Sequence, residues 1–316
     1  MHDHGALREA LTADRYADID HHHPEVRKEV FDWGIWLSKK LNLHGMRLDA
    51  VKHYSERFLL EFLDHMTTND KEDLFFVGEY WKDDLGTMIN YLNNMKHQFS
   101  LFDTELVYRF RDASSQPDYF LPRIFDGTLV QARPINSVTL VTNHDTQKGQ
   151  ALEIDINGWF KPLAYALILL RLQGYPCVFW GDLVGTAGGP EQAAGASCGG
   201  QLSDLILARK LYAYGEQDEY FNFATCIEWV RRGTWSQPDG CAVVMSDAGP
   251  GYKEMHVDPK HKGERWTDVL GWNKTIAVIG DDGKATFHCS ETSVSVYVRE
   301  GAPGREFFGK YRPQML

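Results

Sequence analysis

The stretch Gly45-Met46-Arg47-Leu48-Asp49-Ala50-Val51-Lys52-His53 decides the fold, because an apolar, strand-like run ends in it abruptly at a carboxylate. Two later runs end in the same way, residues 75–79 at Glu79 and residues 138–145 at Asp145. The carboxyl ends of parallel strands meet at one edge of a sheet, where barrel enzymes place their chemistry. We therefore expect the three acids to converge at one end of a parallel sheet.

Three converging acids suit the hydrolysis of a glycosidic bond. One carboxyl group protonates the leaving oxygen and one attacks the anomeric carbon, each with a pKa set by its neighbours. A third carboxylate can orient the sugar and favour the developing positive charge. Any one of the three could be an ordinary strand-end cap, but Arg47, His53 and His144 in their company favour the catalytic interpretation.

Arg47 lies two residues before Asp49 and therefore shares its face of the strand, because side chains alternate between the two faces. A guanidinium at that position would pair with Asp49 and hold it ionised. A purely structural salt bridge would have the same geometry, so the spacing alone leaves both interpretations open.

Length and composition restrict the class of protein. A chain of 316 residues with 43% hydrophobic residues can bury one large domain plus a small one, or two of middling size. A formal charge of −11 argues against nucleic acid or an anionic membrane as partner. The longest apolar run, residues 162–170, is too short to cross a membrane and is expected to be a buried helix.

The five cysteines are scattered, odd in number and without metal-ligand spacing, which is typical of reduced thiols in a cytosolic protein. The first five residues have neither a basic start nor an apolar stretch, so no signal peptide is expected there. These two observations together predict a cytoplasmic location.

Strand-like and helical patterns alternate up to residue 215. We expect helices at residues 24–43, 55–66, 104–112, 160–172 and 202–212, and strands at 45–50, 75–79, 99–102, 138–142 and 177–179. This alternation predicts an α/β fold, part of a (β/α)8 TIM barrel. After residue 215 short β runs at 226–231, 241–245, 275–279 and 293–298, divided by turn signals, predict an all-β module.

Four motifs in this order resemble the α-amylase family, glycoside hydrolase family 13, and within it the liquefying type of bacteria and fungi. Residues 45–53 look like the family's nucleophile strand, with Met46 where Phe is usual, and residues 77–81 like its acid/base strand. Residues 141–145 are similar to the strand that carries the third acid. Residues 174–182 resemble the last barrel strand, with Trp180 where Tyr is common.

The resemblance implies barrel strands 4 to 8 within residues 16–215, then a C-terminal β-sandwich domain at 216–316, with residues 1–15 as a remnant outside the family. Five barrel strands can be read where a closed barrel needs eight. We therefore interpret the chain as N-terminally truncated, without the first three strands and the calcium-rich inserted domain. An open edge at strand 4 predicts instability and weak or no activity from this chain alone.

The resemblance also implies a role for each acid. Asp49 would be the nucleophile, Glu79 the general acid and then the base, and Asp145 the group that stabilises the distorted sugar, with retention of configuration. The residues implied to bind substrate are Arg47, Lys52, His53, Tyr80, Trp81 and His144. Loop packing is the alternative for Tyr80 and Trp81, and a structural role is the alternative for His144.

A calcium site is implied at Asp18, Asp20 and the main-chain carbonyl of His53, since calcium takes six to eight oxygens. Helix capping is the alternative for the two aspartates. Thr12 and His22 stand where the liquefying type usually or often has Asp. The run of histidines at 21–23 has no structural zinc spacing and is expected to be a solvent-facing loop.

The sequence is compatible with three functions. The first is retaining endo-hydrolysis of α-1,4-glucosidic bonds in starch or glycogen by a calcium-dependent monomer, without nucleic acid or membrane partners. The second is a transglycosylase of the same family, which uses the same acids. The third is an inactive fragment that binds glucans, because the first barrel strands are missing.

Overall fold

A computed structural model describes residues 19–71, 73–96, 98–116, 119–187 and 194–310. The chain divides into two compact units, Met1–Glu79 with Asn94–Phe99 and Tyr80–Asn93 with Ser100–Leu316. In the described residues, no helix is both long enough and apolar enough to cross a membrane.

The first unit pairs two parallel strands, β1 (Gly45–Leu48) and β2 (Phe75–Gly78), with helices α2 (Pro24–Leu41) and α3 (Glu56–Asn69). Proline at the start of α2 suits the first helical turn, where its missing N–H is not needed. Ser55 caps α3 by accepting the N–H of Phe58 at 3.4 Å. Gly45 is required in β1, because a Cβ there would lie 2.2 Å from the carbonyl oxygen of Phe75.

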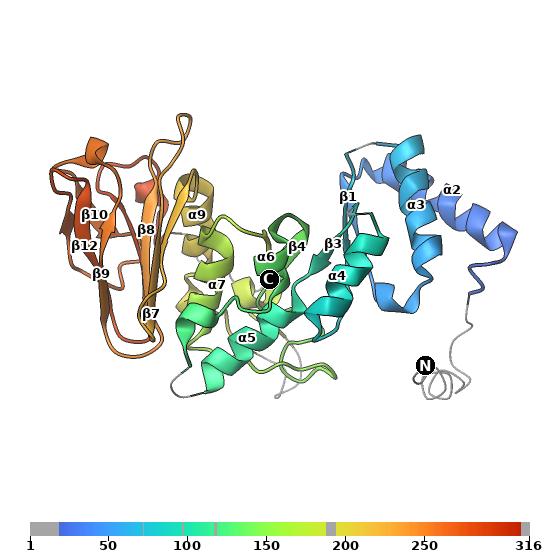
Figure 1. Cartoon of the computed structure of the whole chain (residues 1–316), viewed down its shortest axis with the longest axis horizontal. Helices are drawn as coiled ribbons and strands as arrows, with labels where there is room; N and C mark the ends of the chain where they lie inside the picture. Colours follow the sequence, from blue (N-terminus) through green and yellow to red (C-terminus); the bar gives the residue numbers. More distant parts are fainter. Residues whose placement is uncertain (1–18, 72, 97, 117–118, 188–193, 311–316) are drawn as a thin grey trace. The chain divides into compact units, whose positions relative to one another are not determined.

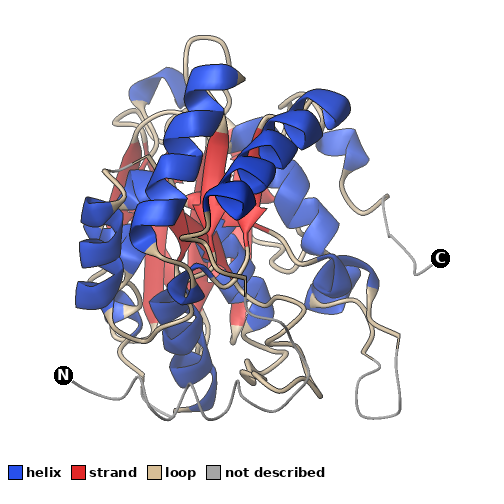
Figure 2. Ribbon diagram, turned by 90° about the vertical axis from the view of Figure 1, so that its right-hand side faces the viewer, coloured by secondary structure: helices blue, strands red, loops and turns tan. Residues whose placement is uncertain are grey.

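The second unit begins with the rest of the parallel strands. β3 (Ser100–Phe102) pairs with β4 (Ser137–Leu140), and β4 pairs with β5 (Tyr175–Cys177), all in parallel. Figure 2 distinguishes helices from strands by colour. Helices separate successive strands along the chain. They are α4 (Leu85–Asn94), α5 (Thr104–Ser115), α6 (Leu129–Ala132), α7 (Lys161–Leu170), α8 (Trp180–Val184) and α9 (Leu202–Tyr212).

Helix α7 is the core of this part. Every residue from Leu163 to Leu170 is buried, as its uninterrupted apolar sequence predicts, and the helix packs beside α9 (Figure 1). Its last carbonyl, that of Leu170, accepts hydrogen bonds from Arg231 Nη1 at 3.2 Å and from the Trp229 indole at 3.3 Å. The β domain therefore caps the barrel helix directly.

The β domain consists of antiparallel strands in two sheets that face one core. One sheet has the order β11-β10-β13-β8-β7-β6 and the other pairs β12 with β9. The strands are β6 (Gln217–Tyr220), β7 (Cys226–Arg231), β8 (Cys241–Ser246), β9 (Gly251–His256), β10 (Arg265–Asp268), β11 (Ala277–Val278), β12 (Lys284–Cys289) and β13 (Ser293–Arg299). Side chains from both sheets meet in one buried cluster that includes Val244, Trp266 and Phe287.

The predicted fold class is confirmed: parallel strands alternate with helices, and a β-sandwich follows. Boundaries differ in places. The strand expected at 177–179 lies two residues earlier, because Phe179 already precedes the first turn of α8. The run expected at 275–279 contributes only the two residues of β11. Strands β6, β9, β10 and β12 were not predicted, since their exposed faces carry charged and polar residues.

Candidate active site

The ends of β1 and β2 bring two of the three predicted acids together in the first unit. Glu79 extends the parallel ladder beyond β2, since its N–H donates to the Leu48 carbonyl at 2.9 Å and its own carbonyl accepts the Val51 N–H at 3.0 Å. Arg47 then reaches both acids. Its Nη1 lies 2.8 Å from Asp49 Oδ1, and its Nη2 lies 2.9 Å from Glu79 Oε2.

The two carboxyl groups have different surroundings. Glu79 is only 7% exposed, and burial is the main cause that raises its pKa; Arg47 opposes this shift and the nearby Asp49 adds to it. The Asp49 side chain is 67% exposed. A carboxyl group whose pKa is raised by burial, beside one that is open to solvent, is the arrangement of a general acid next to a nucleophile.

The backbone turns sharply after Asp49. Ala50 has φ 46° and ψ 42°, in the left-handed region that a residue with a side chain seldom adopts. In this conformation the Ala50 N–H points to Glu79 Oε2 at 3.4 Å, which lowers the pKa of that carboxyl. Strain of this kind is held at functional sites more often than elsewhere, so the turn supports a site at Asp49.

An open groove of about 300 Å³ lies beside Asp49 within the first unit. Its walls are mostly apolar, with Arg47 and Asp49 as the charged groups, and include Trp33, Tyr54 and Phe58. Asp49 therefore lines an open, mostly apolar groove. Lys52 and His53 follow in the short 3-10 helix Val51–His53 and are exposed.

Tyr80 and Trp81 belong to the second unit and are partly buried. The Tyr80 ring centroid lies 4.8 Å from that of Tyr91. The indole N–H of Trp81 donates to the Tyr108 hydroxyl at 3.2 Å. Both rings therefore pack against their own loop and helices, which holds them in place whether or not a sugar stacks on them.

The third acid, Asp145, lies in a tight loop after β4 in the second unit. The side-chain oxygen of Asn143 accepts the N–H of Asp145 at 3.0 Å and that of Thr146 at 2.8 Å, which fixes the turn. His144 Nε2 lies 3.2 Å from Asp145 Oδ2, and the Asp145 side chain is 40% exposed. Asn143 is thus a positioning residue that we did not predict, although it stands inside the quoted motif.

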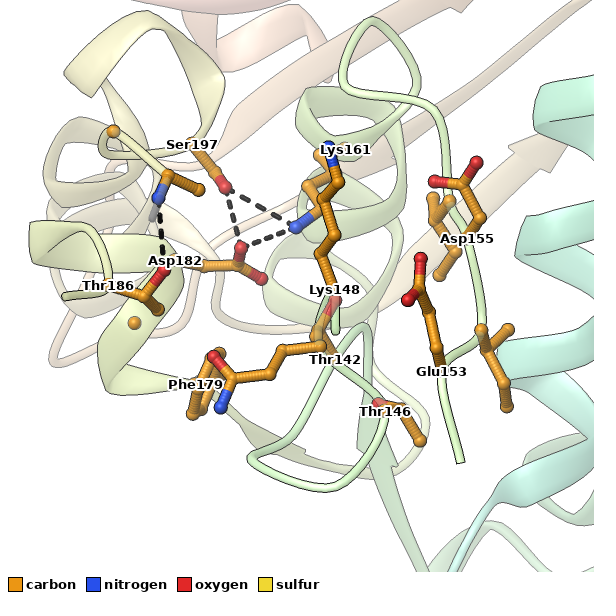
Figure 3. Close-up of a pocket in the computed structure, with 16 residues that line it drawn as sticks. Thr142, Thr146, Lys148, Glu153, Asp155, Lys161, Phe179, Asp182, Thr186 and Ser197 are labelled. Atoms are coloured by element: carbon orange, nitrogen blue, oxygen red, sulfur yellow. Dashed lines mark hydrogen bonds and ion pairs between the residues drawn. The ribbon is translucent and has the colours of Figure 1, made fainter. Parts of the chain in front are cut away.

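A small polar cavity of about 90 Å³ adjoins this loop at the carboxyl ends of β4 and β5 (Figure 3). Asp182, almost fully buried, accepts hydrogen bonds there from Lys161 Nζ at 2.5 Å, Ser197 Oγ at 2.6 Å and the Tyr165 hydroxyl at 2.5 Å. Glu153 lies across the cavity from Asp182 (Figure 3). Asp182 is the last residue of the fourth motif, residues 174–182, but that motif does not predict its hydrogen-bond partners.

Of the three residues expected to bind calcium, the structure describes Asp20 and His53. Asp18 lies outside the described residues. Asp20 is exposed, and its Oδ1 accepts the N–H of His22 at 2.8 Å. Across the described ranges, no group of three or more His, Cys, Asp or Glu side chains could hold a metal. Within the described residues, then, no cluster of such side chains supports a calcium site.

Comparison with known proteins gives the same family as the motifs. A family model described as "Alpha amylase, catalytic domain" matches residues 9–205. The alpha-amylase of Bacillus licheniformis is 42% identical over 286 residues, which are 90% of this chain and 56% of that protein. The cytoplasmic alpha-amylase of Escherichia coli K12 is 41% identical over 290 residues, 90% of this chain and 58% of that protein. The chain thus spans little more than half the length of these relatives.

Solved structures show the same fold. An Anoxybacillus alpha-amylase superposes with a TM-score of 0.68 at 19% identity and covers 90% of this chain and 65% of that one. A Geobacillus thermoleovorans alpha-amylase, solved with acarbose, superposes with a TM-score of 0.66 at 18% identity and covers 90% of this chain. At such identities the likeness concerns the fold alone.

Proposed function

Because this chain belongs to the alpha-amylase family, we propose that it carries the acids of a retaining endo-hydrolase of α-1,4-glucosidic bonds in starch and glycogen. The observation that supports this most directly is the guanidinium of Arg47 between Asp49 and Glu79. Retaining glycosidases need two carboxyl groups about 5 Å apart with unequal proton affinities. One guanidinium that binds both groups keeps them close, and burial raises the pKa of Glu79.

In the first step Asp49 attacks the anomeric carbon of the bound glucan. The bond from that carbon to the glycosidic oxygen breaks, and Glu79 gives its proton to the departing oxygen. The products are a covalent glucosyl ester on Asp49 and a shortened glucan with a free hydroxyl. Asp49 must be ionised for this attack, and Arg47 Nη1 lies 2.8 Å from its Oδ1.

In the second step water replaces the departed sugar. Glu79, now ionised, takes a proton from this water as its oxygen attacks the anomeric carbon. The ester bond to Asp49 breaks, and both groups return to their starting protonation states. Two inversions at one carbon give net retention. We assign to Asp145 and His144 the contacts that hold the distorted sugar ring.

Hydrolysis is favoured over transfer to another sugar by the names of the relatives. Besides the alpha-amylases, a glucan 1,4-alpha-maltohexaosidase of Bacillus sp. strain 707 is 41% identical to this chain. The test is the incubation of an active form with maltoheptaose. Shorter oligosaccharides alone, released in the α configuration, are expected; products longer than the substrate would instead identify a transglycosylase.

We also propose that residues 16–215 form the catalytic part of the chain and that residues 216–316 form the β domain. We propose that the protein is a monomer and that it is located in the cytoplasm, which the name of the E. coli relative supports.

Calcium binding through Asp18, Asp20 and the His53 carbonyl has no support from the described side chains. Its test is thermal unfolding with and without calcium, where an increase in Tm would support binding.

A further inference from the structure

We propose that Cys226 and Cys289 form a redox-modification site, a pair of thiols that a peroxide oxidises to a disulfide between the two sheets of the β domain. This goes beyond the proposed function and does not depend on it. All five cysteines are free thiols in the structure. The pair differs from the other three because both of its sulfur atoms lie against one glycine of the β domain, Gly251.

The strand register brings the two cysteines to one corner of the sandwich. Cys226 on β7 pairs with Ser246, the last residue of β8, and Cys289 on β12 pairs with Gly251, the first residue of β9. Strands β8 and β9 belong to different sheets, and only residues 247–250 connect them. The chain crosses from one sheet to the other at this corner, so the two cysteines flank the crossing.

At this corner the distance between the two sheets need not prevent a disulfide between them. Facing sheets lie about 10 Å apart, whereas the Cα atoms of a disulfide are about 4.4–6.8 Å apart. Gly251 provides the room at the corner. A Cβ added to Gly251 would lie 2.3 Å from the sulfur of Cys226 and 3.1 Å from that of Cys289. Both sulfurs therefore point into the space that the missing side chain leaves.

The chemistry of the pair suits oxidation. The neighbouring Cys226 is the main cause that lowers the pKa of Cys289, and the neighbouring Cys289 is the main cause that raises the pKa of Cys226. The contact between the two thiols therefore makes Cys289 the more acidic of the pair, while burial raises the pKa of both. The fully buried Glu228 also lies close to Cys226 and further raises the pKa of its thiol.

The reaction balances with one peroxide for each pair. The thiolate of Cys289 attacks a peroxide oxygen, the oxygen–oxygen bond breaks, and a sulfenic acid and water result once a proton is taken up. The thiol of Cys226 then attacks this sulfur, forms the disulfide and releases a second water. Two thiols are oxidised by two electrons in all, and hydrogen peroxide is reduced to two waters.

The experiment uses the whole chain with Cys177→Ser, because Cys177 is exposed and would link separate molecules. The reduced protein is treated with hydrogen peroxide, and intact mass and a non-reducing peptide map are recorded. A loss of two hydrogens, with the peptides of Cys226 and Cys289 joined, is expected. The Tm of the β domain should rise by about 5 °C or more, since the bond closes a long loop.

The matched control is Cys241→Ser, which changes a buried cysteine at the far end of β8 and should still form the bond. Cys226→Ser and Cys289→Ser should each abolish it, and circular dichroism of the reduced variants checks that they fold. A disulfide that joins any other pair would overturn the proposal, as would oxygen addition without loss of hydrogens in the folded parent.

Discussion

Arg47 Nη2 lies 2.9 Å from Glu79 Oε2, so the guanidinium that pairs with Asp49 also binds the carboxyl group expected to act as the acid. The second contact depends on strand register. Arg47 on β1 stands opposite Val77 on β2, two residues before Glu79. A single side chain thus contacts both acids, and its charge lowers the pKa of Glu79.

Replacement of Arg47 by Gln should therefore move the pH dependence of the reaction. Arg47 lowers the pKa of Glu79 against the effect of burial, so its loss lets that pKa rise further. In any active form of the protein, kcat/KM should fall by about 10²-fold. The alkaline limb of its pH profile, which reports ionisation of the acid, should shift to higher pH.

The control for this variant is Arg57→Gln, which removes an exposed arginine paired with Glu61 in the same unit. It should leave both the rate and the profile unchanged. An alkaline limb that stays in place in Arg47→Gln would show that Glu79 is not the titrating acid.

Glu79→Gln should lower the rate on starch by several orders of magnitude while the protein stays folded. Substrates with a good leaving group need little protonation, so their first step should suffer much less. The measurement compares maltosides of different leaving-group pKa in the parent and the variant. Equal losses on all of them would remove Glu79 from the acid role.

The buried pair of Lys161 and Asp182 should contribute to the stability of the second unit. Lys161→Met leaves the Asp182 carboxylate, 5% exposed, with the hydroxyl groups of Ser197 and Tyr165 as hydrogen-bond partners. Removal of one partner of a buried pair costs about 3–5 kcal/mol. Urea unfolding of Lys161→Met, Asp182→Asn and the double variant should give a coupling energy of about 1–3 kcal/mol.

Lys148→Met serves as the comparison, because Lys148 lines the same cavity but is exposed. It should change stability by less than about 0.5 kcal/mol. Additive effects of the two changes at Lys161 and Asp182 would mean that the pair is not coupled.

Glu228 should make the β domain less stable as pH rises. Burial raises its pKa to about 7 from a usual 4.5. Below pH 4.5 the Glu228 carboxyl group is protonated in both the folded and the unfolded chain. The contribution of this protonated group to the free energy of unfolding is therefore fully present there. Between 4.5 and 7 the unfolded chain releases the proton first, and the free energy of unfolding should fall by about 3 kcal/mol.

Glu228→Gln cannot titrate and should lack this part of the pH dependence. Unfolding by urea at pH 5, 6, 7 and 8 compares it with the parent and with Glu254→Gln, an exposed glutamate on β9. The parent and Glu254→Gln should follow the same curve. If Glu228→Gln follows it too, the carboxyl group is ionised in the folded protein.

The sequence predicted those features that depend on local spacing. The alternation of strand faces predicted the ion pair between Arg47 and Asp49, and the apolar run at 162–170 predicted a buried helix, which the structure confirms. Local spacing did not predict contacts between segments that lie far apart in the sequence. Glu79 reaches Arg47 through the pairing of β1 with β2.

The same limit explains what was missed in the second unit. Asp182 finds Lys161 and Ser197 only after α7 and α8 have packed. Cys226 and Cys289 looked scattered because their proximity depends on the register of four strands in two sheets. Polar edge strands such as β9 carry a weak alternation of apolar residues, so they were read as connections.

The most direct test of the proposed chemistry is to trap the covalent intermediate. A 5-fluoro-glycosyl fluoride built on maltose slows the second step, so the sugar should accumulate on the nucleophile of an active form. Peptide mass spectrometry should then find the label on Asp49, and Asp49→Asn should carry none. A label on Glu79 or Asp145, or full turnover by Asp49→Asn, would contradict the assignment of Asp49 as the nucleophile.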